Sequence, residues 1–221
     1  MMDLIYRWPS AAKFGKRVPK EKFYEHGTVT TAVREKFVSE VQRITWAYKL
    51  AEATVNLAGD AEVPEIQVFH IEAKGSDVPE SVLMAIDNAI PFPIIFEIHR
   101  GGGETDSIRM AAAHKQLAGG VPKLSDYYTT DWLPPNADRL ALPPAISLST
   151  LYTALLAPLL PVSACAGQNT SEIAERLKTV QKLERDIAAL ERKLRNEPQL
   201  NRKIELRRTL KTKQAELEQQ R

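Results

Sequence analysis

The sequence predicts an α+β protein, with a small mixed β-sheet domain and packed helices followed by a C-terminal α-helical coiled-coil extension. Apolar stretches rich in Ile, Val and Phe, which are typical of buried strands, lie at residues 65–74 and 91–100. Segments with the apolar spacing of helices alternate with them. Residues 170–221 carry apolar residues close to a three-four repeat between charged ones. These observations predict a basic N-terminal arm (1–28), an α+β domain (29–165) and the helical extension (170–221).

The composition is that of a globular protein and places the positive charge near the C-terminus. The 221 residues are 43% hydrophobic and 26% charged, with a net charge of +2. Residues 171–221 hold 14 Lys/Arg and 9 Asp/Glu, a net of +5, which leaves 16 and 19, a net of −3, for the rest. A single cysteine, Cys165, excludes an intrachain disulfide, and no apolar run is typical of a signal peptide or a membrane span. We therefore expect a cytoplasmic protein without a membrane segment.

The first half of the domain is predicted from apolar spacing and turn residues. Residues 1–28 are expected to be irregular. Apolar residues spaced by three and four predict a helix over 30–50, capped by Thr30 or Thr31. A short strand over 53–59 and a central strand over 65–74 follow.

The second half of the domain begins with a clear helix signal. Asp77, Pro79 and Glu80 predict the start of a helix over 77–90. We then expect a strand over 91–100, a glycine turn, an antiparallel return strand over 108–115, and a long loop over 116–149 that covers the sheet. An apolar helix over 147–160 should break at Pro158.

The extension is predicted to form two helices, because Pro198 interrupts its apolar repeat and forces a hairpin or a kink. One isolated helix cannot bury such an apolar seam. We therefore expect the seam to pack against residues 199–217, a second copy of the chain or a larger protein partner. The predicted partner-binding seam consists of Leu177, Val180, Ile187, Leu190 and Leu194.

A nuclease-like pair lies at the end of the strand over 65–74. Glu72 and Lys74 share one strand face with His70. Glu72 could bind Mg²⁺ and Lys74 could orient an attacking water, as in restriction-endonuclease-like enzymes. That chemistry needs a second carboxylate on the neighbouring strand, where the sequence offers Asn56. We therefore expect no catalytic residue and no cofactor, with a Mg²⁺-dependent nuclease that uses Glu72 and Lys74 as the alternative.

The histidines give no metal signal in the sequence. A single His in an apolar strand, such as His70, is more often a hydrogen-bonded core residue than a base. His26, His99 and His114 are scattered, and no cysteine cluster accompanies them. We expect no zinc site and no other metal site.

Two basic segments are candidates for weak, salt-dependent binding of DNA or RNA. The segment 201–213 has a single acid, Glu205, and the N-terminal arm alternates lysines with aromatic residues that could stack on bases. A solvated helix face and an arm packed on the domain are the simpler alternatives. The predicted nucleic-acid contacts are Arg202, Lys203, Arg207, Arg208, Lys211, Lys13, Lys16 and Arg17.

Six segments together resemble a known family. "RVPKEKFY", "ITWAYKLAEATVNL", "EIQVFHIEAK", "AIDNAIPFPIIFEI", "AAAHK" and "NRKIELRRTL" follow one another in this order. They are similar to the bacterial domain of unknown function 4391 family over nearly the whole chain. The chain departs from it at His114-Lys115, where the resemblance leads us to expect an aromatic residue before the lysine.

The resemblance carries over no catalytic residue, but it implies a setting. It implies a small prokaryotic protein encoded beside helicases and DNA methyltransferases in restriction–modification or anti-phage islands. With the residue-based predictions, this indicates a non-catalytic accessory subunit of a defence complex. Its C-terminal helices would dock a larger subunit such as a helicase or a DNA methyltransferase, and its basic residues would contact nucleic acid. A homo-oligomeric scaffold is a further alternative.

Overall fold

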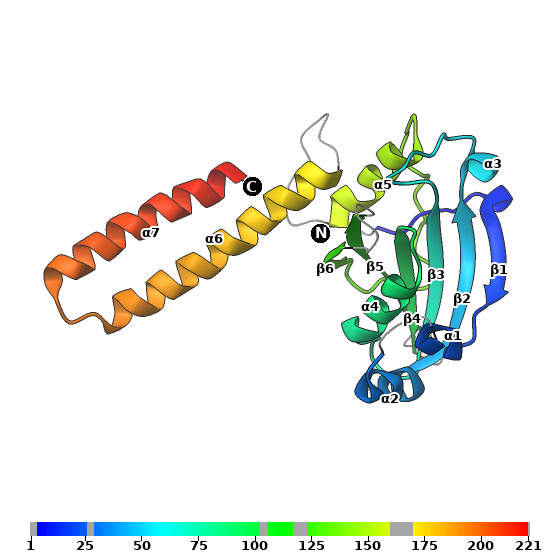
Figure 1. Cartoon of the computed structure of the whole chain (residues 1–221), viewed down its shortest axis with the longest axis horizontal. Coiled ribbons are helices and arrows are strands. Elements are labelled where there is room, and N and C mark those ends of the chain that lie inside the picture. The colour runs from blue at the N-terminus through cyan, green and yellow to red at the C-terminus, as the bar shows by residue number, and fades with distance from the viewer. Residues whose placement is uncertain (1–3, 26–28, 102–105, 117–122, 160–169, 221) are drawn as a thin grey trace. The chain divides into compact units, whose positions relative to one another are not determined.

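The computed structural model describes residues 4–25, 29–101, 106–116, 123–159 and 170–220 (Figure 1). The chain divides into two compact units, Met1–Leu159 and Leu160–Arg221. The first unit is a mixed α+β domain, and the described part of the second, residues 170–220, contains the two helices that the sequence predicts. None of the described helices has the length and apolarity needed to cross a membrane.

The first unit is built on a six-stranded sheet whose strands follow chain order from β1 to β6. The pair β3–β4 is parallel and the other four pairs are antiparallel. The strands are β1 (Lys13–Arg17), β2 (Val41–Leu50), β3 (Ile66–Ala73), β4 (Ile94–Arg100), β5 (Ser107–Gln116) and β6 (Lys123–Thr129). The predicted strands over 65–74 and 91–100 and the return strand after them are confirmed.

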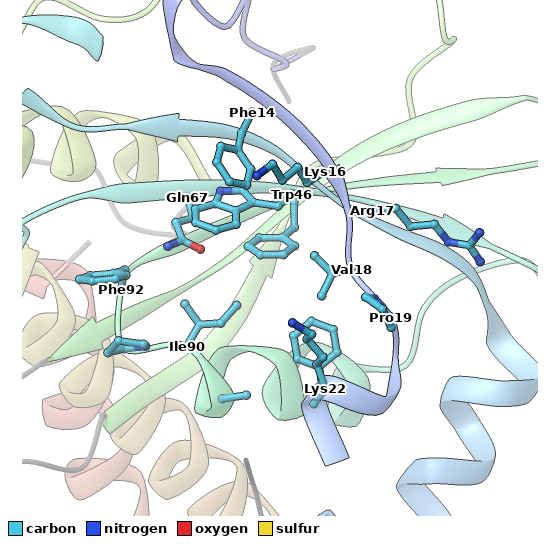
Figure 2. A pocket seen from close by; sticks show the side chains of 14 residues that line it. Phe14, Lys16, Arg17, Val18, Pro19, Lys22, Trp46, Gln67, Ile90 and Phe92 are labelled. Carbon is cyan, nitrogen blue, oxygen red and sulfur yellow. The ribbon is translucent and has the colours of Figure 1, made fainter. Parts of the chain in front are cut away.

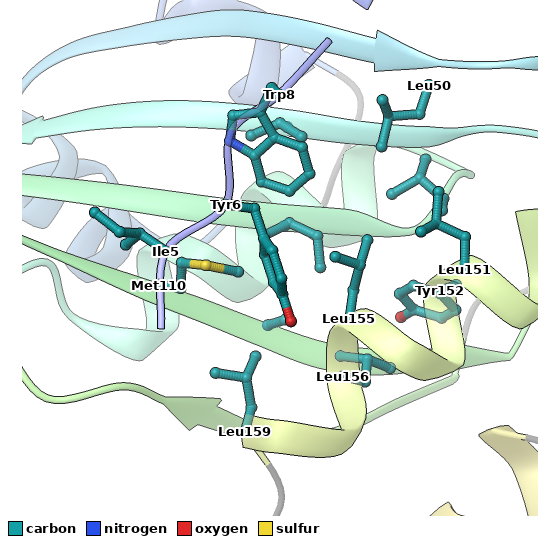
Figure 3. Close-up of a cluster of buried hydrophobic side chains, with 14 of the residues drawn as sticks. Ile5, Tyr6, Trp8, Leu50, Met110, Leu151, Tyr152, Leu155, Leu156 and Leu159 are labelled. Atoms are coloured by element: carbon teal, nitrogen blue, oxygen red, sulfur yellow. The ribbon is translucent and has the colours of Figure 1, made fainter. Parts of the chain in front are cut away.

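Two hydrophobic cores cover the two faces of the sheet. One face packs against α1 (Glu21–Glu25), α2 (Thr31–Glu40) and α4 (Glu80–Ala89), with Phe37 and Phe69 at its centre. The other face packs against residues 4–8 and α5 (Leu148–Leu156), which continues as a 3₁₀ turn, Ala157–Leu159. Figure 3 shows Tyr6, Trp8 and Tyr152 in this second core. Each face of the central strands therefore packs against a hydrophobic core over most of its length.

The parallel pair places two strand ends at the same edge of the sheet. Helix α4 makes the crossover from β3 to β4 that a parallel pair requires, and it buries Val82, Leu83 and Ile86. Its N-cap is Pro79 rather than the predicted Asp77. The Asp77 side chain instead accepts a hydrogen bond from Val78 N at 2.7 Å and pairs with Arg109 at 2.7 Å.

The predicted helix over 30–50 is wrong beyond residue 40. Thr30 caps α2 as expected, but the chain continues as strand β2. The register of β2 against β3 shifts between Val41 and Arg43 and again between Trp46 and Tyr48. Each irregularity moves the following side chains to the other face of the strand. Buried residues consequently recur every third position along β2, and this spacing imitates a helix.

Three shorter predictions are also corrected. The expected strand over 53–59 begins as a short helix, α3 (Glu52–Val55), which ends at Asn56 in a left-handed conformation with φ of 55°. The long loop over 116–149 contains β6. The arm expected to be irregular contains a 3₁₀ turn (Ser10–Ala12), strand β1 and helix α1. Strand β1 is the edge of the sheet, so these basic residues belong to the domain surface.

The second unit is an antiparallel helical hairpin. Helices α6 (Thr170–Asn196) and α7 (Leu200–Gln220) are separated at Pro198 and run side by side (Figure 1). Val180, Leu183 and Leu217 are buried, and Lys213 pairs with Asp186 at 3.5 Å across the hairpin. Ile187, Leu190 and Leu194 of the predicted seam are half-buried. The Leu177 side chain and Cys165 lie outside the described part of the chain.

Candidate functional site

Polar side chains gather where β3 and β4 end. The parallel register pairs His70 with Glu97 and Glu72 with His99. These four side chains alternate with apolar residues such as Phe69 and Phe96 that point into the opposite core. The parallel pair therefore assembles a polar cluster from two segments that are separated in sequence by helix α4. We call His70, Glu97 and His99 the His–Glu–His cluster.

Glu97 is the anchor of this cluster and is completely buried. Trp8 Nε1 donates to its Oε1 at 2.6 Å, and Arg139 donates through Nη1 to Oε1 at 2.8 Å and through Nη2 to Oε2 at 3.1 Å. Burial raises the pKa of the Glu97 carboxyl, but the interactions with His70 and Arg139 outweigh burial and hold that pKa at about 2. The Glu97 side chain is therefore ionised at neutral pH.

The two histidines of the cluster are less completely satisfied. His70 Nε2 lies 3.0 Å from Glu97 Oε2, at ion-pair distance but without the alignment of a hydrogen bond. The rings of His70 and His99 are 5.3 Å apart between centroids. Both Nε2 atoms are buried and have no hydrogen-bond partner in the described part of the chain. Burial, followed by the charge of His70, lowers the pKa of His99, which favours its neutral imidazole.

A cavity of about 350 Å³ opens beside the cluster. His70, His99 and Glu72 line it, together with Ser107 of β5 and two residues near the start of β2. The donor atoms of His70, Glu97 and His99 all lie within 4.8 Å of one another. Among the described residues, this is the group of histidine and carboxylate side chains that could hold a metal ion.

Glu72 and Lys74 have other partners. Glu72 Oε2 lies 3.5 Å from Arg43 Nε on the neighbouring strand β2. Lys74 follows the end of β3, and its Nζ donates to the Val38 carbonyl at the end of α2 at 2.6 Å. The β2 residue opposite Glu72 is thus a cation rather than the second carboxylate that the nuclease chemistry requires.

A second buried ionic cluster surrounds Lys115, which follows His114 at the position where the chain departs from the expected family pattern. Lys115 Nζ contacts Asp87 Oδ1 at 2.7 Å and donates to the carbonyls of Asp87, Ile90 and Phe92 at 2.8, 2.8 and 2.9 Å. Tyr127 donates to the other Asp87 oxygen. These bonds satisfy the carbonyls at the C-terminal end of α4. Burial lowers the pKa of Lys115 and raises that of Asp87. We call this group the Lys115 cluster.

An aromatic and basic pocket of about 500 Å³ lies beside the edge strand β1 (Figure 2). Phe14 packs on Trp46 with ring centroids 4.1 Å apart, and Lys16 Nζ lies 4.8 Å from the Phe14 centroid. Trp46 Nε1 donates to the Tyr48 carbonyl at 3.0 Å, which fixes the indole. Half-buried Phe92 and the exposed Lys16, Arg17 and Lys22 also line the pocket. We call this the Phe14–Trp46 pocket.

The predicted nucleic-acid residues fall on two surfaces. Lys16 and Arg17 line the Phe14–Trp46 pocket, and Lys13 is exposed on the same strand. Arg202, Arg207, Arg208 and Lys211 are exposed on α7, and Lys203 is half-buried. The first set belongs to the sheet domain and the second to the helical hairpin.

A family model, domain of unknown function (DUF4391), matches residues 7–217. The chain therefore belongs to this family, and the resemblance inferred from its six segments is confirmed. No curated protein and no solved structure matches the chain.

The sequence analysis did not predict a role for Glu97 or Arg139, and it did not predict that His70 and His99 lie side by side. The available signal was the alternation in "IIFEIHR", where Glu97 and His99 interrupt an otherwise apolar strand on one face. A buried strand with two polar residues on one face points to a polar site on that face. The partner His70 could be found only with the parallel register of β3 and β4.

Proposed function

We propose that the protein is a non-catalytic accessory subunit that contacts nucleic acid through the Phe14–Trp46 pocket and docks a protein partner through its helical hairpin. The observation that carries the proposal is the composition of the pocket. Half-buried aromatic rings form its wall, and exposed Lys16, Arg17 and Lys22 stand at its rim. Aromatic walls stack on bases and cations neutralise phosphates, so this combination suits a single-stranded segment of DNA or RNA.

The neighbouring lysine Lys20 shows how the basic residues divide their roles. Lys20 Nζ donates to the carbonyls of Phe37 and Val41 and closes the end of α2. Burial, followed by the charge of Lys74, lowers its pKa. Lys16 and Arg17 instead are exposed at the pocket, with Lys16 Nζ over the Phe14 ring, so phosphate contact there costs little desolvation.

The hairpin supports the docking half of the proposal. Ile187, Leu190 and Leu194 remain half-buried although α6 and α7 pack together, and Ile204 is exposed. A third helix laid along this seam would complete a coiled-coil-like core. The partner we propose is a helical segment of a larger subunit, such as the helicase or DNA methyltransferase that the family resemblance implies for a restriction or anti-phage complex. A second copy of the chain is the competing occupant.

Two contacts weigh against the alternative of a Mg²⁺-dependent nuclease. Arg43 occupies the β2 position opposite Glu72, and Lys74 is bonded to the end of α2. A metal at Glu72 would need to displace the Arg43 guanidinium. The carboxylate on the other neighbouring strand, Glu97, lies opposite His70 rather than opposite Glu72.

Fluorescence anisotropy with a labelled oligonucleotide tests the nucleic-acid half of the proposal. We expect binding that weakens by more than about tenfold between roughly 50 and 200 mM salt. Phe14→Ala and Lys16→Glu should each weaken it, whereas Lys123→Glu, a charge reversal on the opposite edge strand β6, should leave it unchanged. Equal weakening by Lys16→Glu and Lys123→Glu would show that the attraction is nonspecific and does not involve the pocket. If no binding is detected at low salt, the proposed nucleic-acid contact is wrong.

Sedimentation of the full chain, with and without the proposed helicase or DNA methyltransferase partner, tests whether the hairpin docks a partner. We expect a complex that Leu190→Asp abolishes, while Arg185→Asp, an exposed position on the same helix, leaves it intact. Self-association of the chain alone that Leu190→Asp abolishes would replace the partner with a second copy.

A further inference from the structure

We propose that His70, Glu97 and His99 bind a divalent transition-metal ion through two imidazole nitrogens and one carboxylate oxygen. Zn²⁺ and Fe²⁺ are the ions that accept this combination of ligands most readily. The proposal does not depend on the Phe14–Trp46 pocket or on nucleic-acid binding.

The first support is geometric. The parallel register places Glu97 directly beside His70, and His99 follows two residues later on the same face of β4. The three donor atoms lie within 4.8 Å of one another. Bonds of about 2.0–2.2 Å place the donors of one ion roughly 3–4 Å apart. We expect side-chain rotations of the two histidines to close this difference when an ion binds.

The second support is the state of the two Nε2 atoms. Buried polar atoms in proteins nearly always have a partner, and each exception needs an explanation such as a bound ion. His70 Nε2 and His99 Nε2 are both buried without a hydrogen bond to the described residues. A metal ion bound by both nitrogens would satisfy two such atoms at once.

The third support is the bonding of Glu97. Its Oε1 already accepts from Trp8 and from Arg139, and its Oε2 accepts one further bond from Arg139. A carboxylate oxygen has room for two such contacts, so Oε2 keeps one, and His70 Nε2 lies 3.0 Å from this oxygen. Trp8 and Arg139 would act as positioning residues that hold the carboxylate in place. The Arg139 charge weakens the attraction for a cation, so two imidazoles are needed beside the carboxylate.

The cavity of about 350 Å³ supplies an entry path and space for further ligands. His70 and His99 line it, so a bound ion would keep open positions on the cavity side for water or a small ligand. The competing occupant of the site is a proton on His70, which would form an imidazolium paired with Glu97.

Imidazole NMR spectra of the chelator-treated, untagged full chain distinguish the two occupants without any substitution. The chain contains four histidines. On addition of one equivalent of Zn²⁺, we expect the ¹⁵N resonances of His70 and His99 to shift, while those of His26 and His114 stay in place. Absence of a shift, or equal shifts of all four, would overturn the proposal.

Calorimetric titration with Zn²⁺ compares the affinity of the unmodified chain with that of variants at the site and at a matched control position. We expect one ion per chain, with affinity lowered more than about tenfold in His70→Ala and in His99→Ala. Glu72→Gln removes a carboxylate that lines the same cavity and should change the affinity by less than about threefold, since Glu72 is paired with Arg43. Unchanged binding in His99→Ala, or an equal loss in Glu72→Gln, would overturn the ligand set. Circular dichroism of each variant in the absence of metal establishes that the fold is retained.

Discussion

Two buried ionic clusters lie in the sheet domain, and they differ in how completely the protein satisfies them. In the Lys115 cluster, the ammonium has four oxygen contacts, and both Asp87 oxygens are bonded. In the His–Glu–His cluster, the carboxylate is held by Trp8 and Arg139, but two imidazole nitrogens have no hydrogen bond to any residue that the structure describes. A buried charge is tolerated when it is fully paired, so the first cluster is explained by structure alone. The second cluster is explained only in part.

The two clusters also differ in their access to solvent. The side chains of Lys115 and Asp87 are 0% and 1% exposed, whereas those of His70 and Arg139 are each 30% exposed. The Lys115 cluster closes the end of α4, where an exchangeable ligand has no access. The His–Glu–His cluster borders a cavity. Incomplete bonding together with access is what distinguishes a binding site from a structural ion pair.

The largest effect is expected from breaking the closed cluster. Lys115→Met leaves the Asp87 carboxylate and the α4 carbonyls buried without their donor, and should lower the free energy of unfolding by about 3–5 kcal/mol. Lys123→Met on the exposed edge of β6 is the control and should change it by less than about 0.5 kcal/mol. Urea unfolding of both variants is the measurement. A loss below about 1 kcal/mol for Lys115→Met would contradict the structural role.

Breaking the support of the open cluster should cost less. Arg139→Met removes two hydrogen bonds from Glu97, but the Arg139 side chain is partly exposed, so we expect water to replace the lost donors. We expect a loss of about 1–3 kcal/mol in urea unfolding without added metal. A loss as large as that of Lys115→Met would show that the two clusters are equally closed and would remove the contrast between them.

Much of the domain followed from local patterns, and the exceptions have physical causes. The apolar runs of β3 and β4, the Thr30 cap and the break at Pro198 each act within a few residues, and each was predicted correctly. Strand β2 was mistaken for a helix because two register shifts spaced its buried residues by three. The α+β class survived this error because the neighbouring strands were assigned correctly.

The candidate site was less predictable because it depends on pairing between distant segments. The sequence placed His70 beside Glu72 and Lys74 on one strand, which directed attention to the wrong neighbours. The register of β3 against β4 brings Glu97 to His70, and a loop after β6 brings Arg139. Such contacts follow from the topology of the sheet and leave only a weak trace in local periodicity.

A smaller effect is expected at Glu72, whose ion pair with Arg43 is exposed to solvent. Glu72→Gln should change the free energy of unfolding by less than about 0.5 kcal/mol. We also expect the purified protein, alone and with its partner present, to cleave neither single- nor double-stranded DNA with Mg²⁺ or Mn²⁺. Metal-dependent cleavage that disappears in both Glu72→Gln and Lys74→Ala would restore the nuclease alternative.

The smallest effect concerns Asp60, a carboxylate that is well bonded but lies at the surface. The Ser149 hydroxyl and the backbone N–H groups of Val63 and Glu62 donate to it, and these bonds lower the pKa of the Asp60 carboxyl below its usual range. A lowered folded-state pKa contributes stability above the unfolded value, and this contribution disappears as pH falls through the folded value. Asp60→Asn should therefore flatten the decline of stability below about pH 4, measured by urea unfolding across pH. An unchanged pH profile would show that bonding without burial has no measurable effect here.

A crystal of the full chain soaked in Zn²⁺ tests the contrast between the clusters most directly. We expect an anomalous scattering peak from an ion about 2.0–2.2 Å from His70 Nε2, His99 Nε2 and Glu97 Oε2, and no peak at the Lys115 cluster. If, after saturation with Zn²⁺, His70 Nε2 and His99 Nε2 lie next to water or to no other atom, the proposed metal site is wrong.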